Sequence, residues 1–404
     1  MQLQLQYIDG GVTAPQGYFA TGVSCGIKAN GEKDLALLCS EDVAAVAGVF
    51  TTNKVKGHSL KLTMQNIKSG YAMAIVINSG NANACVGDKG DSDARAIAAK
   101  TAELLECSPT DVLVGSTGVI GVTLDIDKVL AGIDEAVSAM DPQGGHDASL
   151  AIMTTDTVAK EISAQFELQG EPVIIGGMAK GSGMINPNMA TMICVLTTDA
   201  NINKRLLEIA LKDVCDKTFN RITIDGDTSV CDMVIVFANG LADNPGIVSQ
   251  DDDYYAFYSA LEKVCEHLAK KIVSDGEGAT KLIEVNVTGA KTTECAHLAC
   301  SAIANSNLVK TAIYGSDANW GRIITAVGYS GADVFPERID ISVNKITVCR
   351  SGAAAIYDES KLIEQLNKKD VFINVNLNNG SFEDRVWTCD FSEDYVRINA
   401  TYRS

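Results

Sequence analysis

The sequence predicts an α/β protein built from mixed layers of helices and strands. In its first half, short apolar stretches such as residues 72–77 end in glycine-rich turns and are followed by apolar residues at helical spacing. In its last third, apolar and polar residues alternate, which favours antiparallel strands with one covered face. The 404 residues, 46% of them hydrophobic, provide enough apolar material for two cores or one large core.

The first half supplies most of the expected helices. After the strand at 72–77, apolar residues between Ala94 and Leu105 follow helical spacing, which stops near Pro109. Residues 111–121, DVLVGSTGVIG, predict a short strand that breaks into a glycine-rich loop. Further along, the same reasoning predicts a helix over 204–219, a strand over 233–238 and a long helix over 253–273.

The last third supplies the alternating strands. These are expected within residues 281–289, 338–348, 370–382 and 394–402. The NNG turn at 378–380 predicts a hairpin. A helical stretch near 294–313 is expected to cover one face of these strands.

Composition limits the classes of partner. A net charge of −18 and the absence of basic runs longer than two residues argue against a nucleic-acid surface. Twelve cysteines without a CxxC pair indicate a reduced, cytoplasmic protein. The first residues lack a basic and then apolar pattern, and no apolar run approaches the roughly 20 residues that a bilayer requires, so we expect no secretion signal and no membrane segment.

Two clusters resemble metal sites but are better explained otherwise. The segment Asp225–Asp232, DGDTSVCD, has closely spaced carboxylates without the spacing of a calcium loop, so turn chemistry is favoured over a cation site. Cys295, His297 and Cys300 have no visible fourth ligand, which favours buried thiols beside a half-exposed histidine. We therefore expect no metal.

The glycine-flanked turn GSTGVIG at 115–121 lacks the lysine of a phosphate-binding loop. Its backbone N–H groups and the Thr117 hydroxyl can stabilise an oxyanion, which requires two donors aimed at one point. A purely structural turn is the alternative for this segment taken alone.

The segment KGSGMINPNMATMICVLTTDA at 180–200 carries turn residues before a strand that begins near Thr191. An internal threonine becomes a nucleophile with its own amine as base only after the chain is cut before it. Its hydroxyl can attack the carbonyl of Ala190 in an N-to-O acyl shift if the backbone is held in a fixed, strained conformation. Gly181, Gly183 and Pro187 are residue types that impose such a path.

This segment, together with FTTNKVKGH, NSGNANAC, GSTGVIG, DGDTS, GEGATK, GSDANWGRI and YVRINATYRS, resembles the self-cleaving ornithine acetyltransferase family of arginine biosynthesis. The resemblance implies a two-domain sandwich of sheets covered by helices. It also implies cleavage between Ala190 and Thr191 into an α chain (1–190) and a β chain (191–404) that assemble as an α2β2 heterotetramer. Thr191 would carry the acetyl group from N-acetylornithine to glutamate, with Thr117 and Gly118 as the oxyanion hole.

The resemblance also implies a set of substrate-binding residues. Lys180 can pair with the α-carboxylate of the amino-acid substrate. Glu277 lies in a glycine-flanked loop, where it either assists proton transfer or contacts an amine. The sequence departs from the family at Ser404 and Thr401, which weakens the inference for the C-terminus. The implied positions are Thr154, Lys180, Thr191, Glu277, Asn399 and Ser404.

The implied substrates are small molecules, and no cofactor is expected. Acetyl-CoA is possible as an additional acetyl donor, and the sequence does not decide whether it is used. One alternative is a related self-processing amidase or aminopeptidase with an N-terminal threonine, which would pass the acyl group to water. A second alternative is a catalytically silent binding protein on the same scaffold, against which the joint presence of Thr191, Lys180, Thr117 and Gly118 argues.

Overall fold

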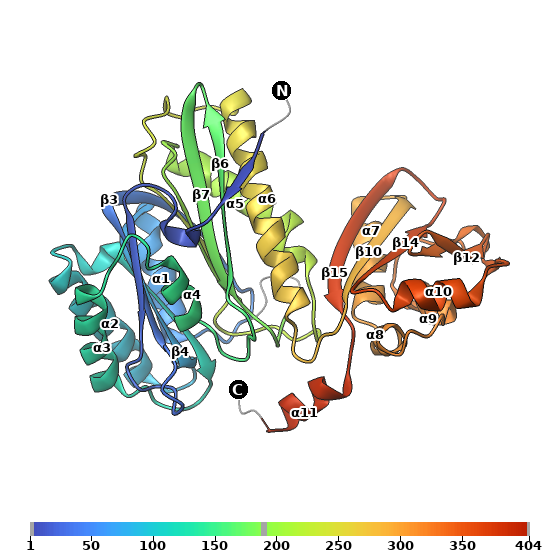
Figure 1. Cartoon of the computed structure of the whole chain (residues 1–404), viewed down its shortest axis with the longest axis horizontal. Coiled ribbons are helices and arrows are strands. Elements are labelled where there is room, and N and C mark those ends of the chain that lie inside the picture. The colour runs from blue at the N-terminus through green and yellow to red at the C-terminus, as the bar shows by residue number, and fades with distance from the viewer. Residues whose placement is uncertain (1–3, 187–191, 402–404) are drawn as a thin grey trace.

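The computed structural model describes residues 4–186 and 192–401. Figure 1 shows a larger lobe, which contains the strands and helices up to α6, and a smaller lobe formed by the chain from β10 to β15. The last helix, α11 (Glu393–Thr401), leaves the smaller lobe and extends back beneath the space between the two lobes (Figure 1).

The larger lobe is organised around one mixed sheet. Within the described residues its order is β1-β6-β7-β8-β9-β3-β4-β5, with β2 paired to β3. The long strand β3 pairs with β2 over its first residues, with β4 as far as Ala45 and with β9 from Ala45 to its end. The strands are β1 (Gln6–Ile8), β2 (Tyr18–Val23), β3 (Leu35–Phe50), β4 (Tyr71–Asn81), β5 (Val112–Val119), β6 (Lys160–Leu168), β7 (Glu171–Lys180), β8 (Ile193–Thr198) and β9 (Met233–Ala238).

Successive side chains of the strands point to opposite faces of the sheet and enter different cores. In β9, Ile235 contributes to an inner core that also contains Ile75 of β4, while Val234 faces a second core beneath α5 and α6. Val76 of β4 faces a third core beneath α2 and α3. The sheet therefore folds around one inner apolar layer and is covered by helices outside, as expected. The helices are α1 (His58–Asn66), α2 (Asp88–Leu104), α3 (Ile126–Ser138), α4 (Gly145–Ala151), α5 (Lys204–Lys217) and α6 (Asp252–Ser274).

The smaller lobe has its own sheet and core. Its described strands follow the order β13-β12-β11-β14-β10-β15. Helices α7 and α8 cover the core, as the helical stretch at 294–313 predicts. The elements are β10 (Leu282–Ala290), α7 (Thr293–Ala304), α8 (Asn307–Tyr314), α9 (Trp320–Tyr329), β11 (Asp340–Val343), β12 (Ile346–Arg350), β13 (Ala353–Ala354), α10 (Glu359–Leu366), β14 (Asp370–Asn376) and β15 (Phe382–Cys389).

Three local predictions are wrong. The NNG turn at 378–380 does not join paired strands, because β14 and β15 lie on opposite sides of β10. Strand β14 runs parallel to β10, and β15 runs antiparallel to it. The predicted loop in 115–121 is largely strand, because β5 continues through Thr117 and Gly118 to Val119 beside β4. The stretch at 394–402 is not a strand, because its described residues belong to α11, where Tyr395 stacks on Phe391 just before the helix.

The predicted chain division at residue 190 falls inside the architecture of the larger lobe. Strand β7 precedes this position and β8 follows it, and the two pair antiparallel with Lys180 opposite Ile193. The large sheet therefore combines strands from both predicted chains, while the division itself stays a prediction. Within residues 4–186 and 192–401, no helix has the length and apolar character needed to cross a membrane.

Candidate active site

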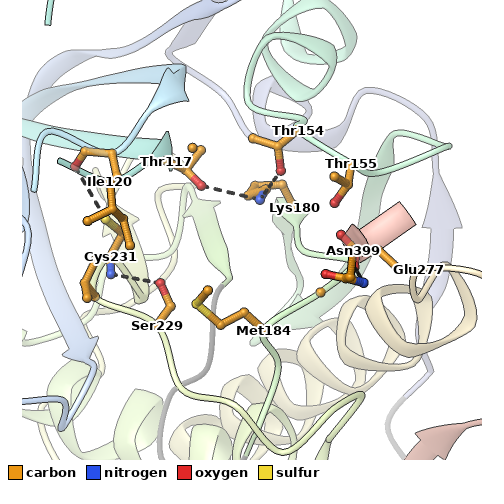
Figure 2. A pocket seen from close by; sticks show the side chains of 14 residues that line it. Thr117, Ile120, Thr154, Thr155, Lys180, Met184, Ser229, Cys231, Glu277 and Asn399 are labelled. Carbon is orange, nitrogen blue, oxygen red and sulfur yellow. Dashed lines mark hydrogen bonds between the residues drawn. The ribbon is translucent and has the colours of Figure 1, made fainter. Parts of the chain in front are cut away.

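A cleft lies where the larger lobe meets α11. Figure 2 shows its side chains arranged around a central space. The lining residues are Ala82, Thr117, Gly118, Ile120, Thr154, Thr155, Lys180, Gly183, Met184, Ser229, Val230, Cys231, Glu277 and Asn399.

This lining includes six residues that the sequence proposes for the site: Thr117, Gly118, Thr154, Lys180, Glu277 and Asn399. They come from strands, loops and a helix that are up to 282 residues apart in the chain. The other three proposed residues, Ala190, Thr191 and Ser404, lie outside the described residues. The structure thus brings the six together, and their chemical roles stay predictions.

Thr117 and Gly118 lie near the end of β5, where it runs parallel to β4. Gly118 has a φ of +130°, and a Cβ atom built on it would lie 2.4 Å from the carbonyl carbon of Gly80. Only glycine fits this backbone at this distance. The close approach of the two strands therefore fixes the backbone at Gly118, directly after Thr117.

Lys180 ends β7 and is 2% exposed. Its Nζ lies 2.7 Å from Thr154 Oγ1 and 3.4 Å from Thr117 Oγ1, as Figure 2 shows. A protonated ammonium only donates, so both hydroxyl oxygens accept and their own hydrogens remain free to donate elsewhere. Burial lowers the pKa of Lys180, which the negative charge of Asp156 partly counteracts.

Behind these residues lies a buried charge network that sequence reasoning missed. The Asp156 carboxylate accepts hydrogen bonds from Lys160 Nζ at 2.6 Å, Gly181 N at 2.7 Å and Thr154 N at 3.0 Å. Lys160 also contacts Asp275 at 2.5 Å. Burial by itself would raise the pKa of Asp156, but the ammonium groups of Lys180 and Lys160 hold it below its usual range. The only sequence signal was the i,i+4 spacing of Asp156 and Lys160.

Glu277 is fixed in the cleft by contacts with the loop after β7 and with α11. Its backbone N–H donates to Ser182 O at 2.8 Å. A Cβ atom on Gly183 would lie 2.5 Å from the Glu277 carboxyl carbon, so a larger residue at position 183 would displace the Glu277 carboxylate. Asn399 of α11 donates from Nδ2 to Glu277 Oε2 at 2.7 Å. Figure 2 shows this pair across the cleft from Ser229 and Cys231.

Ser229 and Cys231 also line the cleft, although the sequence assigned their segment to turn chemistry. Burial raises the pKa of the Cys231 thiol, so this residue is a poor candidate for a thiolate nucleophile. No cluster of three or more potential metal ligands occurs within the part of the chain that the structure describes. His297 instead pairs through Nδ1 with Asp384 at 2.8 Å.

The matches to known sequences span nearly the whole chain. The model of the ArgJ family matches residues 19–404. The arginine biosynthesis bifunctional protein ArgJ of Caldanaerobacter subterraneus is 50% identical over 404 residues, with 99% of this chain and 100% of that protein covered. The protein of the same name from Symbiobacterium thermophilum is 50% identical, with 99% and 100% covered. A crystal structure of an ArgJ protein from Bacillus halodurans is 50% identical, covers 51% of this chain and 97% of its own, and gives a TM-score of 0.50.

Proposed function

The chain belongs to the ArgJ family, and from this premise we propose that it transfers an acetyl group from N-acetylornithine to glutamate in arginine biosynthesis. The products are ornithine and N-acetylglutamate. The enzyme is a glutamate N-acetyltransferase that first cuts its own chain between Ala190 and Thr191. The relatives at 50% identity carry arginine biosynthesis in their names, which supports this assignment.

The observation that carries the proposal is the composition of the cleft. Six residues implied by the family resemblance line it together, and Gly183 and Met184, shortly before the cleavage site, line it too. Met192, directly after Thr191, is held through its backbone N–H by Asp232, the neighbour of the lining residue Cys231. The described residues on both sides of the predicted cut therefore lie at or next to this cleft.

In the proposed reaction, Thr191 Oγ attacks the acetyl carbonyl carbon of N-acetylornithine while the Thr191 amine accepts the hydroxyl proton. The carbonyl oxygen gains negative charge, which the Thr117 hydroxyl and the Gly118 N–H stabilise. Lys180 keeps the Thr117 oxygen occupied as an acceptor at 3.4 Å and so leaves the hydroxyl hydrogen to the oxyanion. The Thr191 amine passes the accepted proton to the leaving nitrogen, and ornithine departs. The glutamate amine then attacks the acetyl ester of Thr191, and its proton returns to Thr191 Oγ as N-acetylglutamate leaves.

The charged groups of the cleft match amino-acid substrates. Lys180 supplies a positive charge for an α-carboxylate, with the Thr154 hydroxyl 2.7 Å from its Nζ. Glu277 supplies a negative charge, buried and held by Asn399, for the amine of ornithine or glutamate or for proton transfer. We assign Ser404, through its hydroxyl, to the same substrate site.

The assembly, compartment and donor range are further parts of the proposal. The cleaved α chain and β chain stay together as an α2β2 heterotetramer in the cytoplasm and require no metal or cofactor. The large sheet, which combines strands from both sides of residue 190, supports a lasting association of the two chains. The word bifunctional in the relatives' names supports acetyl-CoA as a second acetyl donor.

The deciding experiment follows the acetyl group from labelled N-acetylornithine in the purified protein. Label in N-acetylglutamate, together with a fragment whose N-terminal sequence is Thr-Met-Ile-Cys, supports the proposal. Label released as acetate irrespective of glutamate would indicate the amidase alternative. An intact chain without any turnover contradicts the proposal. Repeating the assay with labelled acetyl-CoA tests the second donor.

A further inference from the structure

The acidic segment Asp225–Asp232, which the sequence assigns to turn chemistry and the proposed reaction does not use, contacts the chain on both sides of the predicted cut. Asp225 accepts hydrogen bonds from Met184 N at 2.6 Å and from Ile185 N at 2.9 Å. Met184 has a φ of +57°, in the left-handed region that non-glycine residues rarely adopt. Asp225 thus satisfies two consecutive N–H groups at a strained position.

The carbonyl group of Ile185 is held by the residues that precede Asp225. It accepts a hydrogen bond from Ile224 N at 2.8 Å and one from Thr223 Oγ1 at 3.2 Å. Both backbone polar groups of Ile185 are therefore bound to the segment from Thr223 to Asp225. This anchors the described chain just before the predicted cut.

The downstream side has a matching arrangement. Asp232 Oδ1 accepts from Met192 N at 3.0 Å, and Met233 N donates to Met192 O at 3.1 Å. Asp232 is fully buried, and its second oxygen has no hydrogen-bond partner among the described residues. Ile185 and Met192 are thus each held through both the N–H and the C=O group by one continuous stretch, residues 223–233.

We propose that Asp225 and Asp232 are positioning residues for self-cleavage, which hold the two ends of the segment that contains the Ala190–Thr191 bond. This inference rests on the proposed function. In the step they serve, Thr191 Oγ bonds to the Ala190 carbonyl carbon, and the Ala190–Thr191 C–N bond breaks. The nitrogen takes the hydroxyl proton, and water then hydrolyses the ester to the Ala190 carboxylate and the Thr191 hydroxyl.

Such a shift needs fixed geometry, because the hydroxyl must meet the carbonyl carbon of its own peptide bond. The Asp225 and Asp232 side chains suit this purpose, because their oxygens accept hydrogen bonds from backbone N–H groups on both sides of the predicted cut. A cation site is the less favourable explanation, because the Asp225 oxygens and Asp232 Oδ1 already accept backbone N–H groups. A simple turn does not require contacts to residues 40 positions away.

The test measures the rate of self-cleavage of the full chain during synthesis, by the appearance of residues 191–404 on a denaturing gel and by intact mass. Asp225→Ala and Asp232→Leu each remove an acceptor and are expected to slow cleavage by about 10- to 100-fold. Asp232→Asn keeps a carbonyl acceptor for Met192 N and is expected to restore most of the rate. Asp227→Asn removes a charge from the exposed part of the segment, and we expect it to cleave like the wild-type chain.

Melting temperature and transfer turnover per cleaved molecule separate positioning from general support of the fold. A slow cleavage rate in a protein that melts normally supports the proposal. Cleavage at the wild-type rate in both Asp225→Ala and Asp232→Leu overturns the proposal. It is also overturned if Asp232→Asn lowers the melting temperature, the cleavage rate and the transfer rate together. A wild-type chain that does not cleave contradicts the proposed function itself.

Discussion

Asn399 donates a hydrogen bond from Nδ2 to Oε2 of Glu277 at 2.7 Å and so connects α11 to the loop that follows α6. The two residues are 122 positions apart and close one wall of the cleft. Because Glu277 is buried, its carboxylate depends on a few fixed donors for its orientation. The C-terminal helix therefore takes part in shaping the cleft.

We expect Asn399→Leu to raise KM for N-acetylornithine by roughly tenfold or more, because a hydrogen bond to a charged group contributes about 1.5–3 kcal/mol. Steady-state kinetics with N-acetylornithine and glutamate measure this change. Arg397→Ala is the matched control, because Arg397 lies on the same helix with its side chain 77% exposed. Equal kinetics for both variants would contradict a role of Asn399 in the cleft.

Thr117→Val is expected to lower kcat by about 10²- to 10³-fold, the usual effect of removing one oxyanion donor. Valine keeps the branched shape and the strand propensity of threonine, so β5 is retained. Thr117→Ser keeps the hydroxyl and is expected to retain most of the activity. The comparison of kcat for the two variants is the measurement, and a fully active valine variant would exclude the assigned role.

Gly118→Ala is expected to destabilise the protein by more than about 1 kcal/mol, because alanine is incompatible with a positive φ and its Cβ would meet Gly80 at 2.4 Å. Gly328→Ala is the control, since Gly328 lies in α9 with open space around it. There alanine is expected to stabilise the helix by about 0.5–1 kcal/mol. Urea unfolding of both variants tests whether the two effects have opposite signs.

The charge network around Asp156 predicts how the stability of the fold depends on pH. The pKa of Asp156 is lower in the folded chain than the usual value of about 3.9. Its ionised form therefore stabilises the fold above about pH 4, and this contribution is lost as the pH falls below that value towards the folded-state pKa. Asp156→Asn is expected to lower the free energy of unfolding at pH 7 by about 3–5 kcal/mol and to flatten its dependence below pH 4.

The control for this prediction is Asp333→Asn. Asp333 pairs with Lys291 at 2.8 Å, and the two side chains are 47% and 63% exposed. An exposed pair contributes about 0–1 kcal/mol, so this variant is expected to unfold almost like the wild type. Chemical unfolding at several pH values checks both variants. An Asp156 variant that matches the control would show that the network adds no stability.

Much of the architecture is readable from local patterns. The predicted strand at 72–77 lies within β4, and the predicted helices at 204–219 and 253–273 correspond to α5 and α6. Apolar periodicity succeeds here because each of these elements buries one face or both faces against a neighbour. The cleft residues could be predicted because they lie in sequence motifs, and each motif is a short continuous segment of the chain.

The sequence by itself determined the α/β fold class, the family and the candidate residues Thr117, Gly118 and Lys180. The tertiary structure decided that β14 and β15 flank β10, because strand partners are chosen by burial and pairing between distant segments. It also decided that Lys160 meets both Asp156 and Asp275, and that Asp225 and Asp232 hold the chain around the predicted cut. Buried charges and backbone donors must find partners, and folding brings those partners together from positions that no local pattern connects.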